Sequence, residues 1–124
     1  MIRRKEAKPL TDCIFCKIAS GGIKSDIVYS DEFVTAFRDL NPQAPVHVLI
    51  IPNKHVGSIK EFDDTDRELA AHIFVDVIPK LAKELAIDEA GFRVVINTGE
   101  AGGQTVNHLH VHLLGGRNMK WPPG

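Results

Sequence analysis

The chain has 124 residues and a formal net charge of −1, with 44% hydrophobic and 25% charged residues. This length suits one domain with its own core, and the composition excludes a disordered, fibrous or membrane-spanning protein. The small net charge also excludes a broad basic surface for nucleic acid, so any nucleotide would need a local site.

Residues 1–11 are polar, and a short basic cluster, Arg3-Arg4-Lys5, is interrupted by Glu6. No apolar run follows this cluster, so the pattern predicts a flexible arm rather than a signal peptide or a nucleic-acid-binding arm. Two cysteines without a secretory signal indicate a reducing compartment, the cytoplasm. We therefore expect an arm at 1–11, one domain at 12–124, and neither a nucleic-acid nor a membrane partner.

The first half of the domain reads as a short helix followed by strands. Residues 13–20 are half apolar and end at a glycine pair, which predicts the helix. The β-rich runs 27–29 and 33–37 flank a polar turn and predict a hairpin. The Pro-containing stretch 41–45 predicts a turn, and residues 46–51 predict a third strand.

The second half begins with the long helix of the chain, expected from Asp63 to about Ala86. Five apolar residues recur every four positions there: Leu69, Ile73, Val77, Leu81 and Leu85. Thr65 and Glu68 have the spacing of a capping box, and Pro79 predicts a kink. Residues 92–97 and 108–114 predict two more strands. The sequence thus predicts an α+β domain with about five strands, a largely antiparallel sheet, one long helix and one short helix.

The densest chemical signal is the run His108-Leu109-His110-Val111-His112. Because strand side chains alternate between faces, the three histidines would share one face while Leu109 and Val111 point to the core. An ordinary solvated strand face would show mixed polar residues instead. The pattern therefore predicts a functional site built on imidazoles.

Two kinds of chemistry fit three imidazoles on one face. The first is a catalytic three-histidine zinc site that activates water, although no Asp or Glu lies between residues 101 and 124 to assist it. The second is metal-free and uses one neutral imidazole as a nucleophile toward phosphorus, while its neighbours donate hydrogen bonds or relay a proton. Upstream, the glycines at 99, 102 and 103 would let backbone N–H groups approach a phosphate.

The histidine run and several other segments together resemble the signature of the histidine triad (HIT) superfamily. The core of the resemblance is Asn97, Gly102-Gly103-Gln104-Thr105 and His108-x-His110-x-His112-Leu113-Leu114. Three more segments resemble the nucleotide-binding branch of this superfamily. They are Asn41-Pro42-Gln43-Ala44-Pro45-x-His47, Ile51-Pro52-x-Lys54-His55 and the closing Trp121-Pro122-Pro123-Gly124. The resemblance runs from about Asp12 to the end of the sequence.

The resemblance implies a HIT-like fold whose sheet continues across a homodimer. It also implies a purine nucleoside phosphoramidase, which cleaves P–N bonds in adenosine or guanosine 5′-phosphoramidates and aminoacyl-adenylates through a covalent nucleotidyl-histidine. No catalytic cofactor is implied. Thr105 departs from the family, where serine is usual at the hydroxyl that contacts the scissile linkage, so the leaving-group preference stays open.

The resemblance also assigns roles to individual residues. His110 is similar to the family nucleophile, His112 to its partner at the phosphate, and His47 with His108 to a supporting relay. Asp39, with Leu40 beside it, matches the carboxylate that binds the ribose hydroxyls. The remaining matches are the phosphate contacts Asn97, Gly103, Gln104 and Thr105 and the apolar base pocket Phe15, Ile18, Ile23 and Phe37.

Cys13-x-x-Cys16 has the spacing of a zinc site. His55 and one more histidine would complete a Cys₂His₂ set, and in some bacterial-type relatives that histidine matches His108. A zinc at this position would be structural and would remove His108 from proton relay. The alternative is a pair of unliganded cysteines packed beside Ile14 and Phe15, whereas a redox motif is not expected without a βαβ unit.

Two further functions stay open at this point. A dinucleoside-polyphosphate hydrolase would use the same nucleophile with a different leaving group. A nucleotide-binding interaction protein would use the same pocket, with incidental activity.

Overall fold

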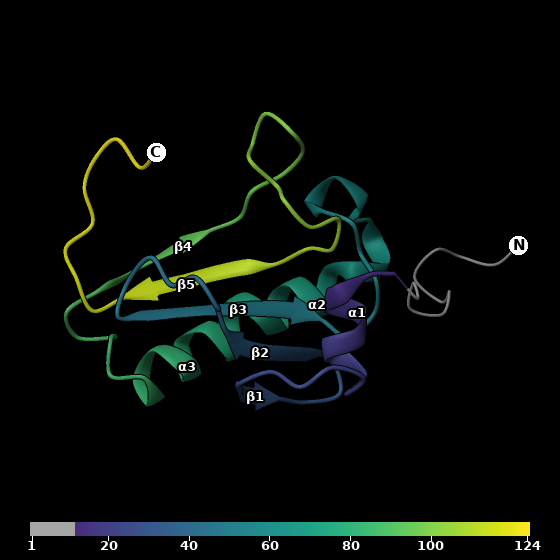
Figure 1. Cartoon of the computed structure of the whole chain (residues 1–124), viewed down its shortest axis with the longest axis horizontal. Helices are drawn as coiled ribbons and strands as arrows, with labels where there is room; N and C mark the ends of the chain where they lie inside the picture. The colour runs from purple at the N-terminus through teal and green to yellow at the C-terminus, as the bar shows by residue number, and fades with distance from the viewer. Residues whose placement is uncertain (1–11) are drawn as a thin grey trace, which may run out of the picture.

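The described part of the chain is one antiparallel sheet with helices on both faces. The computed structural model describes residues 12–124, and the predicted arm at 1–11 lies outside the described residues. Helix α1 (Ile14–Ala19) precedes strands β1 (Ile27–Ser30), β2 (Val34–Arg38) and β3 (Val46–Pro52). Helices α2 (Arg67–Ala71) and α3 (Ile78–Glu84) follow, and then strands β4 (Phe92–Val95) and β5 (Val111–Gly115) (Figure 1).

The five strands lie in the order β1-β2-β3-β5-β4, and every neighbouring pair is antiparallel. Sequential hairpins account for β1 to β3, whereas β5 inserts between β3 and β4. This insertion brings the histidine-containing end of the chain beside β3. The predicted α+β class with a five-stranded antiparallel sheet is confirmed.

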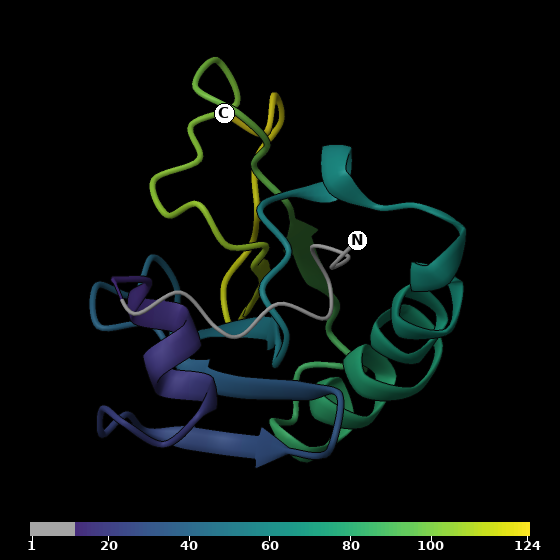
Figure 2. The same ribbon diagram turned by 90° about the vertical axis from the view of Figure 1, so that its right-hand side faces the viewer.

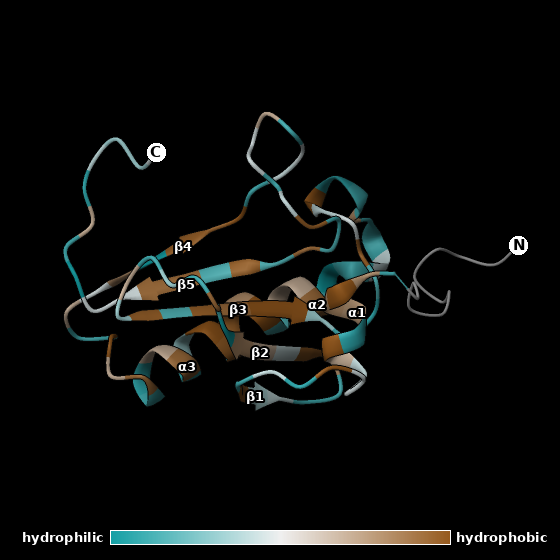
Figure 3. Ribbon diagram, in the orientation of Figure 1, coloured by the Kyte–Doolittle hydropathy of each residue, from teal (hydrophilic) through white to brown (hydrophobic). Residues whose placement is uncertain are grey.

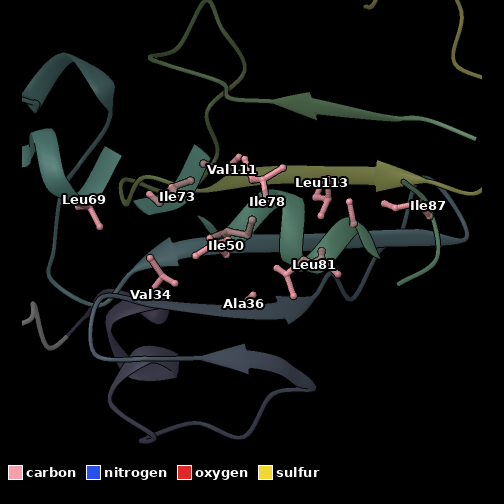
Figure 4. Close-up of a cluster of buried hydrophobic side chains, with 13 residues drawn as sticks. Val34, Ala36, Ile50, Leu69, Ile73, Ile78, Leu81, Ile87, Val111 and Leu113 are labelled. Carbon is pink, nitrogen blue, oxygen red and sulfur yellow. The ribbon is translucent and has the colours of Figure 1, made fainter. Parts of the chain in front are cut away.

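Alternation along β2, β3 and β5 divides the core into two layers. One layer joins Val34, Ala36, Val48, Ile50, Val111 and Leu113 to the helical residues Ile73, Val77 and Leu81 (Figure 4). The other joins Phe37, Leu49 and Ile51 to Phe15, Cys16 and Ile18 of α1. Each fully buried Ile or Leu contributes roughly 1.5–3 kcal/mol. Figure 2 shows α1 and the long helical segment on opposite sides of the strands, and strand β3 is mostly hydrophobic (Figure 3).

The long helical segment is not one regular α-helix. A π-helical stretch, His72–Val77, separates α2 from α3, and Pro79 lies in the first turn of α3. Proline lacks an N–H and crowds the preceding turn, so the wider π-helical turn accommodates the disturbance that the sequence predicted as a kink. Within residues 12–124, none of the helices has the length and apolar character required to cross a bilayer.

The start of this segment also differs from the prediction. The capping box consists of Asp63 and Asp66 rather than Thr65 and Glu68. Asp63 Oδ1 accepts from the N–H of Thr65 at 2.9 Å, and Asp66 Oδ2 accepts from the N–H of Asp63 at 3.0 Å. A 3₁₀ turn, Asp64–Asp66, begins the helix, so the first free N–H groups lie two residues earlier than the predicted capping box indicated.

The last strand is shorter than predicted, because it begins at Val111 rather than at His108. The N–H of Leu109 donates to the carbonyl of Val56 at 2.6 Å instead of joining the ladder with β4. His108 and His110 therefore lie on an extended entry segment. Their side chains are nevertheless buried, and Leu109 and Val111 point to the core as expected.

Candidate functional site

Three imidazoles meet on the α1 side of the sheet. In the antiparallel register of β3 and β5, His47 is opposite Leu114 and Leu49 is opposite His112. Directly opposed residues share a face, so His47 and His112 both lie on the side covered by α1. The ring centroids are 5.2 Å apart for His47 and His112 and 5.1 Å apart for His110 and His112.

The tautomer of His110 is fixed by the backbone carbonyl of His108. Its Nδ1 lies 2.8 Å from the carbonyl oxygen of His108, which can only accept a hydrogen bond. In the neutral form of the ring, Nδ1 therefore carries the proton and Nε2 keeps its lone pair. His110 also lines a cavity, so this arrangement supplies a nucleophilic nitrogen beside a space for a ligand.

Helix α1 holds the His110 ring in place. The ring of Phe15 stands edge-on to His110 at 5.1 Å and to Phe37 at 5.5 Å between centroids. All three residues are at most 7% exposed. Because edge-to-face packing of buried rings limits rotation, the imidazole is preorganised before any ligand binds.

His47 and His112 form a histidine relay. The backbone N–H of Gln43 donates to Nδ1 of His47 at 3.0 Å, and Nε2 of His47 lies 2.9 Å from Nδ1 of His112. Since Nδ1 of His47 accepts, its proton is on Nε2, which donates to His112. The proton of His112 is then on its own Nε2, a buried atom without a hydrogen-bond partner among the described residues. A buried donor of this kind calls for an acceptor from a ligand.

Burial keeps both relay rings neutral at pH 7. It lowers the pKa of His47, although the carboxylate of Asp39 opposes this effect. Burial, together with the neighbouring His110 and His47, lowers the pKa of His112 to about 4. The neutral state matches the tautomers that the hydrogen bonds require.

These tautomers argue against a metal ion at the histidine relay. Ligand atoms of Asp39, His47 and His112 lie within 4.8 Å of one another, so their positions alone would allow one. A metal bound to Nε2 of His47 would move the proton to Nδ1, where it would face the N–H of Gln43 at 3.0 Å. The catalytic zinc site considered from the sequence fails as well, because the ring nitrogens of His108 contact the two cysteines and the carbonyl of Pro52.

His108 instead belongs to a Cys/His cluster with Cys13, Cys16 and His55, whose ligand atoms lie within 4.8 Å of one another. Nδ1 of His108 is 3.4 Å from Sγ of Cys13 and 3.5 Å from Sγ of Cys16, which is 3.2 Å from Nδ1 of His55. Ligands of tetrahedral zinc, bound at about 2.0–2.3 Å, lie at similar separations. Neither Cys13 nor Cys16 forms a disulfide. The donor set therefore fits a structural zinc ion.

The second nitrogen of His108 supports this assignment. Nε2 donates to the carbonyl oxygen of Pro52 at 2.9 Å, which leaves the lone pair of Nδ1 to the cluster. Burial lowers the pKa of His108 to about 4, so the ring is neutral. Neither ring nitrogen contacts His47, His110 or His112, because one faces the Cys/His cluster and the other Pro52. His108 therefore takes no part in the proton relay that the resemblance implied.

A cavity of about 300 Å³ opens in front of His110 and His112. Its apolar wall includes all four residues predicted for a base pocket, Phe15, Ile18, Ile23 and Phe37. Asp39, Leu40 and Thr105 also line it. Leu40 is 98% exposed and so lies at the rim. The structure thus brings together residues from five separate parts of the sequence around one opening.

Other lining residues were not predicted. Leu49 follows His47 by two positions in β3, so both side chains lie on the same face of the strand and Leu49 also lines the cavity. Lys24 and Ser25 reach the opening because Gly21, at φ +83°, reverses the chain after α1. The β3 alternation was visible in the sequence, but the position of residues after a glycine turn has no signal of its own.

A second hollow, the loop hollow, adjoins the cavity at Thr105, which lines both. Its lining consists of Gly99, Glu100, Gly103, Gln104, Thr105 and Asn107. The predicted phosphate contacts Gly103 and Gln104 thus lie beside the cavity rather than in its wall. Asn97, half-buried, lines neither space.

Gln104 braces this loop internally. Its Oε1 accepts from the N–H of Gly99 at 2.9 Å, and its Nε2 donates to the carbonyls of Gly57 and Val106 at 2.7 and 2.9 Å. The backbone N–H of Gln104 donates to the carbonyl of Gly99 at 3.0 Å. These groups are satisfied within the loop, so Gln104 shapes the loop in this state of the protein rather than offering a free donor to phosphate.

A family model for the HIT domain matches residues 20–119. The chain belongs to the HIT domain family. It is similar to the crystal structure of a HIT family hydrolase from Legionella pneumophila, with a TM-score of 0.88 and 50% identity over 91% of this chain and 100% of that one. The family assignment predicted from the histidine run is confirmed.

Two further relatives of this HIT domain bear on metal and nucleotide binding. A 14 kDa zinc-binding protein of Brassica juncea is 47% identical over 120 residues, which cover 91% of this chain and 100% of that protein. A histidine triad nucleotide-binding protein from Candida albicans matches with a TM-score of 0.74 and 34% identity over 90% of this chain and 83% of that one.

Proposed function

We propose that this HIT protein is a purine nucleoside phosphoramidase that works through a covalent nucleotidyl-histidine. The observation that carries the proposal is the hydrogen bond from Nδ1 of His110 to the carbonyl of His108 at 2.8 Å. It leaves an unprotonated Nε2 on a buried ring that lines the cavity. A neutral imidazole in a fixed orientation is the form that attacks phosphorus.

The cavity supports a nucleoside 5′-phosphate as the attacked group. Phe15, Ile18 and Phe37 provide an apolar wall for the flat base. Asp39 lies at the same opening, where an ionised carboxylate can accept hydrogen bonds from both ribose hydroxyls. This placement sets the phosphate between Asp39 and the two histidines.

The reaction then takes two steps. The lone pair of His110 Nε2 forms a bond to phosphorus as the P–N bond of the substrate breaks, and the departing nitrogen takes a proton from solvent and leaves as an amine. Water next attacks the phosphorus and loses a proton to solvent as the bond between phosphorus and Nε2 of His110 breaks, which releases the nucleoside 5′-monophosphate and neutral His110. His112 donates its Nε2–H to a phosphoryl oxygen, which supplies the acceptor that this buried group lacks.

The loop hollow favours an amine over a polyphosphate as the leaving group. Thr105 joins this hollow to the cavity, so it lies where a leaving group would extend. Among residues 12–124, its lining contains the carboxylate of Glu100 and no lysine or arginine. As a leaving group, a nucleoside polyphosphate would place several negative charges beside Glu100, and no cation of the described lining would balance them. An amine leaving group would bring no negative charge. The dinucleoside-polyphosphate hydrolase is therefore the second candidate.

The proposal includes a structural zinc ion at the Cys/His cluster. Both cysteines, as thiolates after release of their protons, and the two imidazole nitrogens would hold the ion, and the two thiolates would neutralise its charge. The bound metal would fix α1 to the segment that carries His108. It would supply no step of the reaction.

A homodimer is also part of the proposal. Strand β4 is an edge strand of the sheet and exposes Phe92, while the helical segment exposes Phe74 and Val75 to solvent at 47% and 69%. An unpaired edge and exposed large apolar side chains are features of association surfaces. Equilibrium sedimentation should give a dimer at micromolar concentration, and only monomer would contradict this part of the proposal.

Mass spectrometry during turnover tests the activity. The protein is quenched while it hydrolyses an adenosine 5′-phosphoramidate, and an adenylyl adduct on the peptide containing His110 is expected. His110→Ala should lose the adduct and more than about 10³-fold in kcat, because the nucleophile is removed. An unchanged rate in a folded His110→Ala would exclude this mechanism.

Two controls separate the other candidates. A diadenosine polyphosphate turned over faster than the phosphoramidate would favour the second hydrolase. Binding of AMP without turnover of either substrate would favour a nucleotide-binding interaction protein.

A further inference from the structure

The C-terminal segment contacts the histidine relay through the turn before β3. Strand β5 ends opposite the beginning of β3, where Gly115 is paired with Val46. Gly116 then passes close to Pro45: it has φ +89°, and a Cβ at this position would lie 2.9 Å from Cβ of Pro45. This close approach brings Arg117 beside the turn at residues 41–45.

Arg117 binds the backbone of that turn. Its Nε donates to the carbonyl oxygen of Gln43 at 2.9 Å, across 74 positions of sequence. The backbone N–H of Gln43 donates to Nδ1 of His47 at 3.0 Å. Gln43 is therefore held through its carbonyl by Arg117 while its N–H sets the protonation of a relay ring.

The direction of every hydrogen bond in the relay follows from that N–H. A backbone N–H can only donate, so Nδ1 of His47 must be unprotonated and the proton must lie on Nε2. Nε2 then donates to Nδ1 of His112 at 2.9 Å. The remaining proton of His112 is placed on the buried Nε2 that has no partner in the described residues.

The reversed relay would fail at the turn. If Nδ1 of His112 donated to His47, the proton of His47 would move to Nδ1 and oppose the N–H of Gln43 at 3.0 Å. His112 would then offer a lone pair instead of an N–H to the phosphoryl group. The position of one peptide group thus decides whether His112 is a donor or an acceptor.

We infer that Arg117 is a positioning residue that clamps the backbone of Gln43 through its carbonyl, steadies the N–H of the same residue, and thereby keeps His112 in the Nε2–H form that donates to the phosphoryl group. This inference rests on the proposed function for the identity of the acceptor. It concerns neither the nucleophile nor the nucleoside pocket. Loss of Arg117 should therefore lower kcat while the affinity for AMP stays the same.

The tautomers can be measured directly in the full-length protein without substrate. In ¹⁵N-histidine-labelled wild type, NMR should show Nε2 protonated and Nδ1 unprotonated for both His47 and His112. In Arg117→Ala, His47 and His112 should become mixtures of two tautomers. His47 with its proton on Nδ1 in the wild type would overturn the inference.

The kinetic arm uses matched variants. Arg117→Ala should lower kcat about three- to tenfold, the effect of loosening one exposed hydrogen bond. Arg117→Lys keeps the charge but lacks the Nε–H, so it should show the same loss. Arg93→Ala is the control, since Arg93 also donates to a backbone carbonyl at 2.9 Å, that of Lys120, without contacting the turn. It should keep the wild-type kcat and tautomers.

The outcomes separate this inference from the proposed function. An active wild type, together with an Arg117→Ala variant unchanged in both tautomers and kcat, would refute the role of Arg117. A wild type with the expected tautomers but without phosphoramidate hydrolysis would refute the proposed function. In that case the tautomer shift in Arg117→Ala would still support the clamp.

Discussion

The carbonyl oxygen of His108 lies 2.8 Å from Nδ1 of His110, so one residue belongs to the Cys/His cluster and also orients its neighbour at the cavity. The ring of His108 contacts Cys13 and Cys16, and its backbone carbonyl accepts a hydrogen bond from Nδ1–H of His110. Occupancy of the proposed zinc site and the orientation of His110 would therefore be linked through a single backbone segment.

Removal of the metal should weaken both the fold and the site. Cys16→Ser replaces a thiolate donor that is 1% exposed, so the variant should lose zinc and on the order of 2 kcal/mol or more of unfolding free energy. It should also lower kcat for the phosphoramidate, because His108 and α1 are less firmly held.

Metal analysis and thermal melting with and without a chelator check this prediction. The chelator should lower the melting temperature of the wild type and leave Cys16→Ser unaffected. A chelator that lowers both equally, or a wild type without bound zinc, would contradict the structural zinc.

The Asp31–His72 pair predicts a pH-dependent contribution to stability. Nε2 of His72 and Oδ2 of Asp31 are 2.6 Å apart and join the turn after β1 to the π-helical stretch. Hydrogen bonds to Asp31 and Asp76 raise the pKa of His72. Burial tends to raise the pKa of Asp31, but its hydrogen bonds from Tyr29, His72 and the backbone prevail and lower it to about 2.

The pH range follows from these directions. Because the pKa of His72 is raised in the folded state, its contribution to folding stability is fully present below the ordinary histidine pKa near 6.5. This contribution is lost as pH rises through the raised pKa. Because the pKa of Asp31 is lowered, its contribution to folding stability is present above the ordinary carboxylate pKa near 4. This contribution is lost as pH falls toward about 2. His72→Gln should therefore cost roughly 1–2 kcal/mol at pH 5.5 and less at pH 9.

Urea unfolding of the wild type and His72→Gln at the two pH values measures this difference. Asp76→Asn is the control, because Asp76 is 65% exposed and its loss should change stability much less. An equal cost of His72→Gln at both pH values would show that the charge of His72 is not involved.

Much of the sheet was predictable because its signals are local. The strands at 27–29, 33–37 and 46–51 were predicted from β-rich runs and from proline and glycine turns, and they agree with β1, β2 and β3 within one or two residues. The capping box failed because Asp63 and Asp66 have the same spacing as Thr65 and Glu68. Only the 3₁₀ turn decides between the two pairs.

The site was predictable where a family signature supplied long-range information. No local pattern connects Cys16 with His108 across 92 positions, and the resemblance alone brought them together. The same resemblance left His108 both in the relay and among the metal ligands, and the hydrogen bond to Pro52 decides between these roles. The contact between Arg117 and Gln43 had no sequence signal, because it depends on the insertion of β5 beside β3.

Gly102 should be intolerant of any side chain. A Cβ at this position would lie 2.3 Å from the carbonyl oxygen and 2.9 Å from the nitrogen of Thr98, and backbone atoms cannot turn aside as a side chain can. Gly102→Ala should therefore displace the loop that carries Thr105 and reduce kcat about tenfold or more.

Gly99→Ala is the matched control for Gly102→Ala in kinetic assays. Its φ is +73°, but nothing lies within 4 Å of an added Cβ, so it should cost only about 1 kcal/mol of stability. If Gly99→Ala lowered kcat as much as Gly102→Ala, general strain in the loop rather than the contact with Thr98 would explain the loss.

The charge of Glu100 should bias the choice of leaving group. Glu100 lines the loop hollow beside Thr105, and the described part of the chain contributes no lysine or arginine to that lining. Glu100→Lys should raise kcat/KM for a diadenosine polyphosphate about two- to fivefold relative to an adenosine 5′-phosphoramidate, because a cation replaces a like charge near the polyphosphate. The ratio should move back toward the wild-type value as salt is added.

Glu89→Lys makes the same change of net charge at an exposed position outside the hollow, so it should leave the ratio unaltered. A shift of equal size in Glu89→Lys would mean that the overall charge of the protein, and not the leaving-group hollow, selects the substrate.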